Sequence, residues 1–151
     1  MFRLNRITRE NYRDALTLTT DSEGKLLLQE EWLPSLAYSL VQSQFEKEWD
    51  VALIECEQLP IGYVMYGKWP EKDRYVLRRF AIDRRYQNRG VGQKVMPLII
   101  SRIQALYDVE DVYALVDRHN ARAVHILKKF GFEDTCEVID GEDVYLLKGH
   151  F

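Results

Sequence analysis

The pattern of hydrophobic and polar positions predicts an α/β fold. Short apolar or alternating runs predict strands, and apolar residues spaced three or four apart predict helices. The predicted strands cover residues 2–7, 51–56, 61–68, 75–82, 111–116, 132–138 and 144–147, and the predicted helices cover residues 8–19, 32–46, 91–106 and 120–130. A strand and two helices come first, an antiparallel meander of strands follows, and strands and helices then alternate before the last two strands. This order indicates a mixed central sheet of six to seven strands flanked by about four helices.

A glycine-containing turn joins the fourth predicted strand to the third predicted helix. It reads Tyr86-Gln87-Asn88-Arg89-Gly90-Val91-Gly92. The first amides of a helix have no intrahelical acceptor, and the helix dipole favours negative charge there. Two glycines remove side chains that would block a phosphate, and an arginine adds a cation. The turn is neither a dinucleotide fingerprint nor a P-loop, because the residues that define those motifs are missing. It predicts a site for a phosphorylated cofactor.

Composition narrows the class of protein. A chain of 151 residues with 46% hydrophobic residues fits one domain over residues 1–151. The net charge of −3 gives no basic excess, so we expect no nucleic-acid partner. No apolar run is long enough to span a membrane, so we expect no membrane partner. Cys56 and Cys136 have no metal-ligand spacing, so we expect reduced thiols, a cytoplasmic protein and no bound metal.

A second motif begins at Asn120 and ends at Phe132. It reads Asn-Ala-Arg-Ala-Val-His-Ile-Leu-Lys-Lys-Phe-Gly-Phe. Together with the glycine turn, it resembles the GCN5-related N-acetyltransferase (GNAT) family, in which Gln87, Gly90 and Gly92 match the glycine turn and Asn120 matches the start of the second motif. The runs over residues 61–67 and 79–83 are similar to the diamine and spermidine acetyltransferase subgroup.

The resemblance implies a binding site for acetyl-CoA as co-substrate, without a metal. Main-chain groups of Phe80, Ala81 and Ile82 would line the acetyl and pantetheine arm. The turn residues Gln87, Asn88, Arg89, Gly90, Val91 and Gly92 would cradle the pyrophosphate. Asn120 would hold the pantetheine side, and Lys128 could approach the ribose phosphate. The amine would attack the thioester directly in a ternary complex, so no covalent intermediate is needed.

Two positions depart from the family pattern. The usual general acid is a tyrosine seven residues after the motif asparagine, where this chain has Leu127. The polyamine relatives often have an acidic residue where this chain has Arg78. The catalytic residues are therefore unknown from the sequence. One interpretation is catalysis by positioning, with water protonating the thiolate. The other is a divergent acceptor or a CoA-binding protein without turnover.

Acceptor recognition is expected from acidic and aromatic residues around the second predicted helix. Carboxylates and aromatic faces bind ammonium groups. The candidate acceptor-binding residues are Glu30, Glu31, Tyr38, Tyr66 and Arg78. Arg78 would repel a polyamine unless another residue pairs with it, which leaves anionic and peptide acceptors open.

The leading function is an N-acetyltransferase that modifies the primary amine of a small molecule, with polyamines such as spermidine as lead candidates. The alternatives are a protein or peptide, amino-acid or antibiotic acceptor, or a CoA-binding protein without catalysis. Exposed edge strands near the C-terminus could pair two copies into a homodimer.

Overall fold

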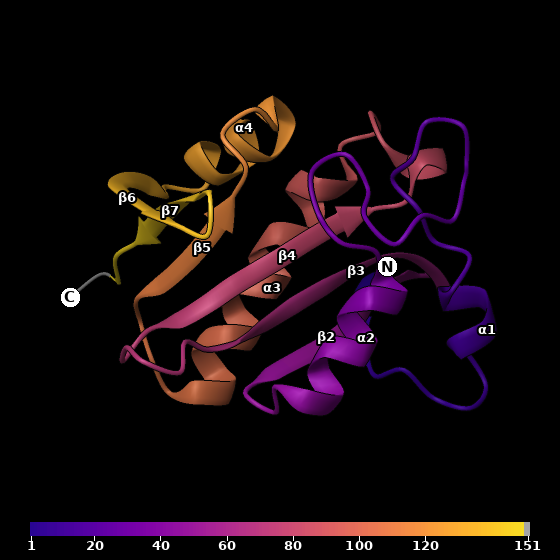
Figure 1. Ribbon diagram of the computed structural model, residues 1–151, viewed down its shortest axis with the longest axis horizontal. Helices are drawn as coiled ribbons and strands as arrows, with labels where there is room; N and C mark the ends of the chain where they lie inside the picture. The colour runs from indigo at the N-terminus through magenta and orange to yellow at the C-terminus, as the bar shows by residue number, and fades with distance from the viewer. Residues whose placement is uncertain (150–151) are drawn as a thin grey trace.

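The computed structural model describes residues 1–149, which form a seven-stranded sheet with helices on both faces (Figure 1). In spatial order the strands are β1 (Phe2–Asn5), β2 (Trp49–Cys56), β3 (Leu59–Lys68), β4 (Tyr75–Ile82), β5 (Val112–Val116), β7 (Glu142–Leu147) and β6 (Glu133–Ile139). All neighbours pair antiparallel except β4 and β5, which are parallel. The predicted mixed α/β sheet is confirmed, and each predicted strand boundary lies within two residues of the observed one.

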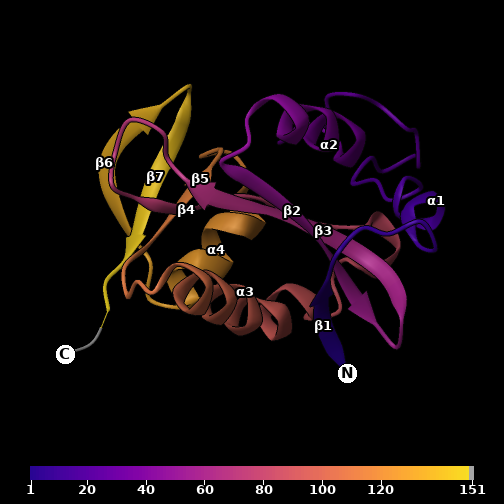
Figure 2. The ribbon, with the colours of Figure 1, turned by 90° about the horizontal axis from the view of Figure 1, so that it is seen from below.

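Two helices cover each face of the sheet (Figure 2). One face carries α1 (Tyr12–Ala15) and α2 (Leu36–Phe45), and the other carries α3 (Val91–Tyr107) and α4 (Ala121–Lys129). The larger apolar core lies under α3, whose buried residues Val95, Ile99 and Ile103 recur every four positions and so share one helical face. A smaller core lies under α1 and α2. A short 3-10 helix, η1 (Arg84–Tyr86), connects β4 to the turn before α3.

The prediction of a helix over residues 8–19 is wrong in length, because α1 contains only Tyr12–Ala15. After Ala15 the backbone hydrogen bonds change to the i−3 type, with the Thr17 amide donating to the Asp14 carbonyl at 3.2 Å, and the α-helix ends. The Thr17 hydroxyl donates to the Asp14 carbonyl at 2.7 Å, and the Thr19 amide donates to the Asp83 carboxylate at 3.0 Å. The β-branched threonines of this segment also disfavour helix. A long-range contact to residue 83 therefore overrides the local helical pattern.

The helix predicted over residues 32–46 begins later, at Leu36. The backbone at Ser35 is extended, and its hydroxyl accepts the Tyr38 amide at 3.1 Å, as an N-cap does. Before the cap, Gln29 and Pro34 form an isolated antiparallel β-bridge. The N-cap therefore sets the start of α2, and residues 32–34 stay in the preceding loop.

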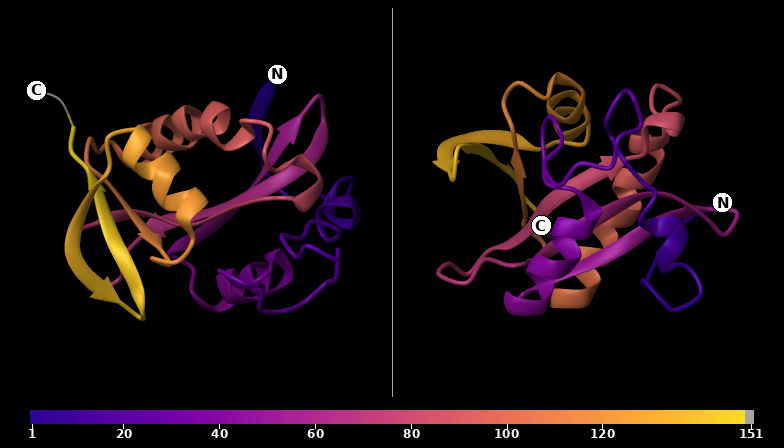
Figure 3. Two further views of the ribbon diagram at one scale, coloured as in Figure 1. Left: turned by 90° about the horizontal axis from the view of Figure 1, so that it is seen from above. Right: turned by 45° about the vertical axis from the view of Figure 1, so that its right-hand side comes forward.

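The hairpin of β6 and β7 lies at one end of the sheet, opposite β1 (Figure 3). It is tied to the loop before β4 by Glu137, whose carboxylate accepts hydrogen bonds from Lys72 at 2.6 Å and Arg74 at 2.7 Å. These two cations hold the pKa of Glu137 below its ordinary value.

We expect Glu137→Gln to lower the free energy of unfolding at pH 7 by about 1 kcal/mol, because it removes two charge-assisted hydrogen bonds. A carboxyl with a depressed folded pKa contributes stability above its unfolded pKa and loses it as the pH falls through the folded value. The difference between the variant and wild type should therefore shrink in urea unfolding at acidic pH. Glu133→Gln is the control, since Glu133 is exposed on the same strand and no ion pair to it is found within residues 1–149. A Glu137→Gln effect equal to that of the control would contradict the prediction.

Candidate functional site

A cleft of about 650 Å³ opens where β4 and β5 diverge. The two strands pair only at Val76 with Tyr113 and Leu77 with Ala114. Beyond Leu77, residues 78–82 of β4 have no strand partner on the side facing β5 within the described part of the chain. Their free backbone groups form one wall of the cleft, and residues of α4 and the start of α3 also line it.

A β-bulge in β4 lies at the point of divergence. Met65 pairs with Arg79 and Tyr66 pairs with Leu77, so Arg78 is the extra residue. The Arg78 guanidinium stacks over the Trp49 ring at 4.6 Å and contacts the Glu46 carboxylate at 3.6 Å. Arg79 turns toward α2 and donates to the Ser39 hydroxyl at 2.8 Å. The bulge therefore brings two consecutive guanidinium groups to the α2 side of the sheet, and both residues line the cleft.

The glycine turn, which the sequence predicts to be a phosphate site, contributes residues to the lining of the cleft. Asn88 and Gly90 have positive φ angles of 64° and 72°, and Gly90 is the N-cap of the 17-residue helix α3. A Cβ atom on Gly90 would meet nothing within 4 Å, so space is open beside the first amides of α3. Free amides, a helix N-terminus and open space fit a phosphate group.

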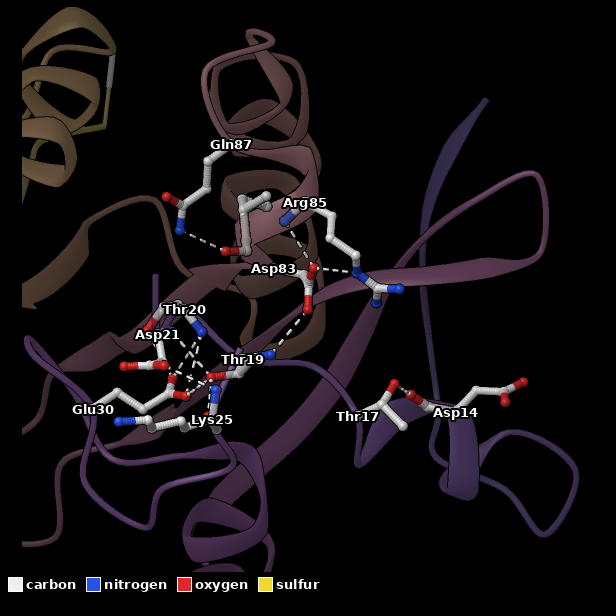
Figure 4. A network of polar contacts seen from close by, with 11 residues as sticks. Asp14, Thr17, Thr19, Thr20, Asp21, Lys25, Glu30, Asp83, Arg85 and Gln87 are labelled. Atoms are coloured by element: carbon white, nitrogen blue, oxygen red, sulfur yellow. Dashed lines mark hydrogen bonds and ion pairs between the residues drawn. The ribbon is translucent and has the colours of Figure 1, made fainter. Parts of the chain in front are cut away.

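Gln87 connects the glycine turn to both walls of the cleft. Its side-chain amide donates to the Ile82 carbonyl at 2.9 Å, as Figure 4 shows, and its oxygen accepts from Arg122 of α4. Gly92 allows α3 and α4 to approach closely, because a Cβ there would lie 2.7 Å from the Ile126 side chain. These contacts fix the turn between β4 and α4.

The other expected cofactor residues divide into two groups. Phe80, Ala81, Ile82, Asn88, Val91 and Asn120 line the cleft together with Gln87, Gly90 and Gly92. Asn120 also caps α4 by accepting the Ala123 amide at 3.3 Å. Arg89 and Lys128 are exposed and are not among the residues that line the cleft. Leu127, at the position of the usual acid, is 4% exposed and lines the cleft as an apolar wall that has no proton to donate.

Of the five expected acceptor residues, Glu31 and Arg78 line the cleft. The other three lie elsewhere. Tyr66 is 4% exposed in the larger core. Glu30 is buried, and its carboxylate accepts hydrogen bonds from Thr19 and Thr20. Tyr38 is exposed beside the Arg79 guanidinium, 5.7 Å from ring centroid to carbon.

The Glu30 contacts belong to a polar network that fastens the loop after α1 to the end of β4 (Figure 4). Asp83 is 2% exposed, and its carboxylate accepts the amides of Thr19 and Arg85 and the side chain of Arg85. The Arg84 amide donates to the Thr19 carbonyl at 2.8 Å. The network holds Thr20 and the following residues, several of which line the cleft, in place.

The structure adds Glu142, a residue that the sequence analysis did not select. It is the first residue of β7, is half-buried and lines the cleft. Burial raises the pKa of its carboxyl, and the charges of Arg79 and Arg78 oppose that rise. Burial also lowers the pKa of Arg79, and the neighbouring charge of Arg78 lowers it further. No local motif marks Glu142, because only the pairing of β7 with β5 brings it to the cleft.

Within residues 1–149, none of the helices is both long and apolar enough to cross a lipid bilayer. Within the same residues, no three or more His, Cys, Asp or Glu side chains are grouped so that they could hold a metal ion.

Known proteins with similar sequences are acetyltransferases. A spermine/spermidine N(1)-acetyltransferase of Bacillus subtilis (strain 168) is 35% identical over 91 residues, which cover 56% of this chain. The match spans 60% of the length of that relative. An N-alpha-acetyltransferase of Sulfurisphaera tokodaii is 30% identical over 71 residues, covering 44% of this chain and 42% of the relative.

Solved structures of low sequence identity share the fold. Spermidine N-acetyltransferase from Vibrio cholerae, in complex with CoA and spermine, matches with a TM-score of 0.70 and 15% identity over 98% of this chain and 95% of its own. PaiA N-acetyltransferase from Thermoplasma acidophilum, in complex with coenzyme A, matches with a TM-score of 0.66 and 14% identity over 98% and 99%. The model of the acetyltransferase (GNAT) family matches residues 8–132, most of the chain. The protein therefore belongs to the acetyltransferase (GNAT) family.

Proposed function

We propose that this protein is an acetyl-CoA-dependent N-acetyltransferase that acetylates a primary amine of a small molecule, with polyamines such as spermidine as the leading acceptors. The observation that carries the proposal is the cleft between the diverging strands β4 and β5, which has a helix N-terminus and an open glycine turn at one end. The names of the Bacillus subtilis and Vibrio cholerae relatives, both polyamine acetyltransferases, support the choice of acceptor.

In this proposal each wall of the cleft binds one part of acetyl-CoA. The amides of residues 87–92 hold the pyrophosphate at the start of α3, where the helix dipole is favourable. The free backbone edge of Phe80, Ala81 and Ile82 binds the pantetheine arm, and Asn120, the N-cap of α4, also lines the cleft. Bound acetyl-CoA supplies an activated acetyl group. A backbone amide of the same free edge stabilises the charge that develops on the acetyl oxygen.

The charges around the cleft are compatible with a cationic acceptor. Arg78 does not act as an isolated cation, because Glu46 pairs with it and the rings of Trp49 and Trp69 lie beneath it. Glu31 is exposed on the loop that lines the same cleft. Glu31 forms part of the acceptor entrance in this proposal, because a carboxylate binds an ammonium group.

The test measures CoA release from acetyl-CoA against spermidine, spermine, putrescine, amino acids, aminoglycosides and short peptides. Mass spectrometry then identifies each acetylated product. We expect a polyamine to gain an acetyl group with the highest kcat/KM. Preference for another amine of the panel would replace polyamines as the acceptor class. CoA binding without turnover of any amine would indicate a CoA-binding protein without catalysis.

Location and assembly are parts of the same proposal. We propose that the protein acts in the cytoplasm and forms a homodimer through β6, which is an edge strand of the sheet. Light scattering combined with size-exclusion chromatography measures the mass in solution, and a monomeric mass would exclude the dimer.

A further inference from the structure

Four carboxylates line the cleft, and they differ in what surrounds them. Asp21 accepts the amides of Glu23 at 3.1 Å and Lys25 at 2.8 Å, so it stabilises its own turn. Asp117 accepts the His119 amide at 2.8 Å. Glu31 is exposed. Glu142 is half-buried, and residues 1–149 provide it with neither a hydrogen bond nor an ion pair. Among these carboxylates, Glu142 is therefore the one that is sheltered from water and still free to take a proton.

The position of Glu142 follows from the order of the strands. β7 lies between β5 and β6 and pairs Asp143 with Val116 near the end of β5. Glu142 is the next residue toward the turn that contains Gly141, so it lies at the mouth of the diverging strands. It lies near Arg78 and Arg79, whose charges act on its carboxyl.

The charges that face Glu142 come from several elements. Arg78 and Arg79 of β4 stabilise the carboxylate, whereas burial, Asp117 of β5 and Asp140 of the turn raise its pKa. On α2, Glu46 pairs with Arg78 at 3.6 Å, and Ser39 accepts from Arg79 at 2.8 Å. Burial prevails, so the carboxyl holds a proton more strongly than an exposed glutamate does. The same two guanidiniums disfavour a third positive charge nearby and so promote loss of a proton from an ammonium group.

Resting on the proposed function, we propose that Glu142 is the catalytic base that takes a proton from the ammonium group of the acceptor. An N–H bond of the ammonium breaks, and the proton moves to a carboxylate oxygen of Glu142. The electron pair left on nitrogen forms the new N–C bond to the acetyl carbon. The C–S bond breaks, and the sulfur leaves with the electron pair of the C–S bond. The nitrogen loses a second proton, which reaches the sulfur through water, and Glu142 returns its proton to solvent.

This assignment gives Arg78 a role in the same step. The sequence alone makes Arg78 an obstacle to a cationic acceptor. Glu46 offsets part of the Arg78 charge, and the charge that remains disfavours the ammonium form of the amine, whose neutral form is the reactive one. Leu127 cannot protonate the leaving sulfur. This does not conflict with a base at Glu142, because the base acts on the amine and the acid acts on the thiolate.

The test compares Glu142→Gln with Asp143→Asn. Asp143 is the next residue of β7, and it pairs with Arg118 at 3.0 Å outside the cleft lining. We expect Glu142→Gln to lower kcat at neutral pH by roughly a hundredfold, the usual contribution of a general base. The loss should shrink as the pH rises toward the pKa of the amine, because the acceptor then arrives already deprotonated. Glu142→Asp should recover part of kcat, and Asp143→Asn should stay near wild type.

Two measurements do not depend on turnover. Calorimetry should give the same CoA affinity for wild type and Glu142→Gln. Carbon-13 NMR of the carboxyl groups should show a resonance that titrates above the ordinary glutamate value and disappears in Glu142→Gln. A titration at or below the ordinary value, or an equal loss of kcat at every pH, would overturn the assignment. An active wild type with an equally active Glu142→Gln overturns this inference alone, whereas a wild type that acetylates no amine overturns the proposed function as well.

Discussion

Gly90→Glu is expected to weaken CoA binding by about a hundredfold or more. A carboxylate about 4 Å from a phosphate charge costs about 4 kcal/mol when the effective dielectric constant is that of a protein surface. Gly90 is the N-cap of α3, and a Cβ there points into open space, so the new side chain would enter the region assigned to the pyrophosphate. Isothermal titration calorimetry with CoA measures the loss.

Backbone strain must be separated from this charge effect. Gly90 has a φ of 72°, and a residue with a side chain costs about 1–2 kcal/mol in that left-handed conformation. Gly141→Glu is the matched control, since Gly141 has a φ of 80° and also has open space around a Cβ. Both variants should lose similar stability, and only Gly90→Glu should lose CoA affinity. Gly90→Lys carries the same strain with the opposite charge and should bind CoA better than Gly90→Glu. Unchanged CoA affinity in Gly90→Glu would remove the phosphate assignment of the turn.

Gly62→Ala is expected to lower the free energy of unfolding by about 3 kcal/mol, because a new methyl group must overlap a fixed backbone atom. Gly62 lies on β3 opposite Ile82 of β4. An ideal Cβ on Gly62 would be only 2.3 Å from the Ala81 carbonyl oxygen. A side chain can rotate away from such a contact, but a strand in the middle of a sheet cannot, so β3 and β4 must separate.

Equilibrium unfolding in urea measures this effect, with Gly141→Ala as the control for loss of a glycine. A Cβ on Gly141 meets nothing within 4 Å, so that variant should lose only the cost of its positive φ, about 1–2 kcal/mol. Because Ala81 belongs to the free edge of β4, Gly62→Ala should also weaken CoA binding in the fraction that remains folded. A Gly62→Ala protein as stable as wild type would show that the two strands can separate without cost.

The local features of the site could be predicted from the sequence. The turn at residues 86–92 and the cap at Asn120 depend on residues that are neighbours in the chain. Gly90 adopts the left-handed conformation that glycine tolerates, and Asn120 accepts a backbone amide as asparagine does at an N-cap. Such features need no knowledge of distant contacts, and for this reason the local structure of the turn and of the cap was predictable.

The acceptor end was not predictable in the same way. Glu30 and Tyr66 are residue types that bind amines. However, Glu30 is buried and accepts hydrogen bonds from threonines, and Tyr66 is packed in the core. Arg78 reads as an unpaired cation in the sequence, and the structure pairs it with Glu46, which lies 32 positions earlier. Which side chains reach the cleft depends on the packing of α2 and its preceding loop against the sheet. Composition and spacing carry no information about that packing.

The sequence by itself determined the strands, the longer helices and the glycine turn, because periodicity and turn chemistry act over a few residues. It also determined the family, through two motifs that stand in order along the chain. Only the tertiary structure decided where α1 ends and which carboxylate reaches the cleft. The Thr19 amide donates to the Asp83 carboxylate instead of continuing α1. Glu142 lies near Arg78 because β7 lies between β5 and β6. The first outcome depends on a contact between residues 64 positions apart, and the second depends on the pairing of Val116 with Asp143, 27 positions apart.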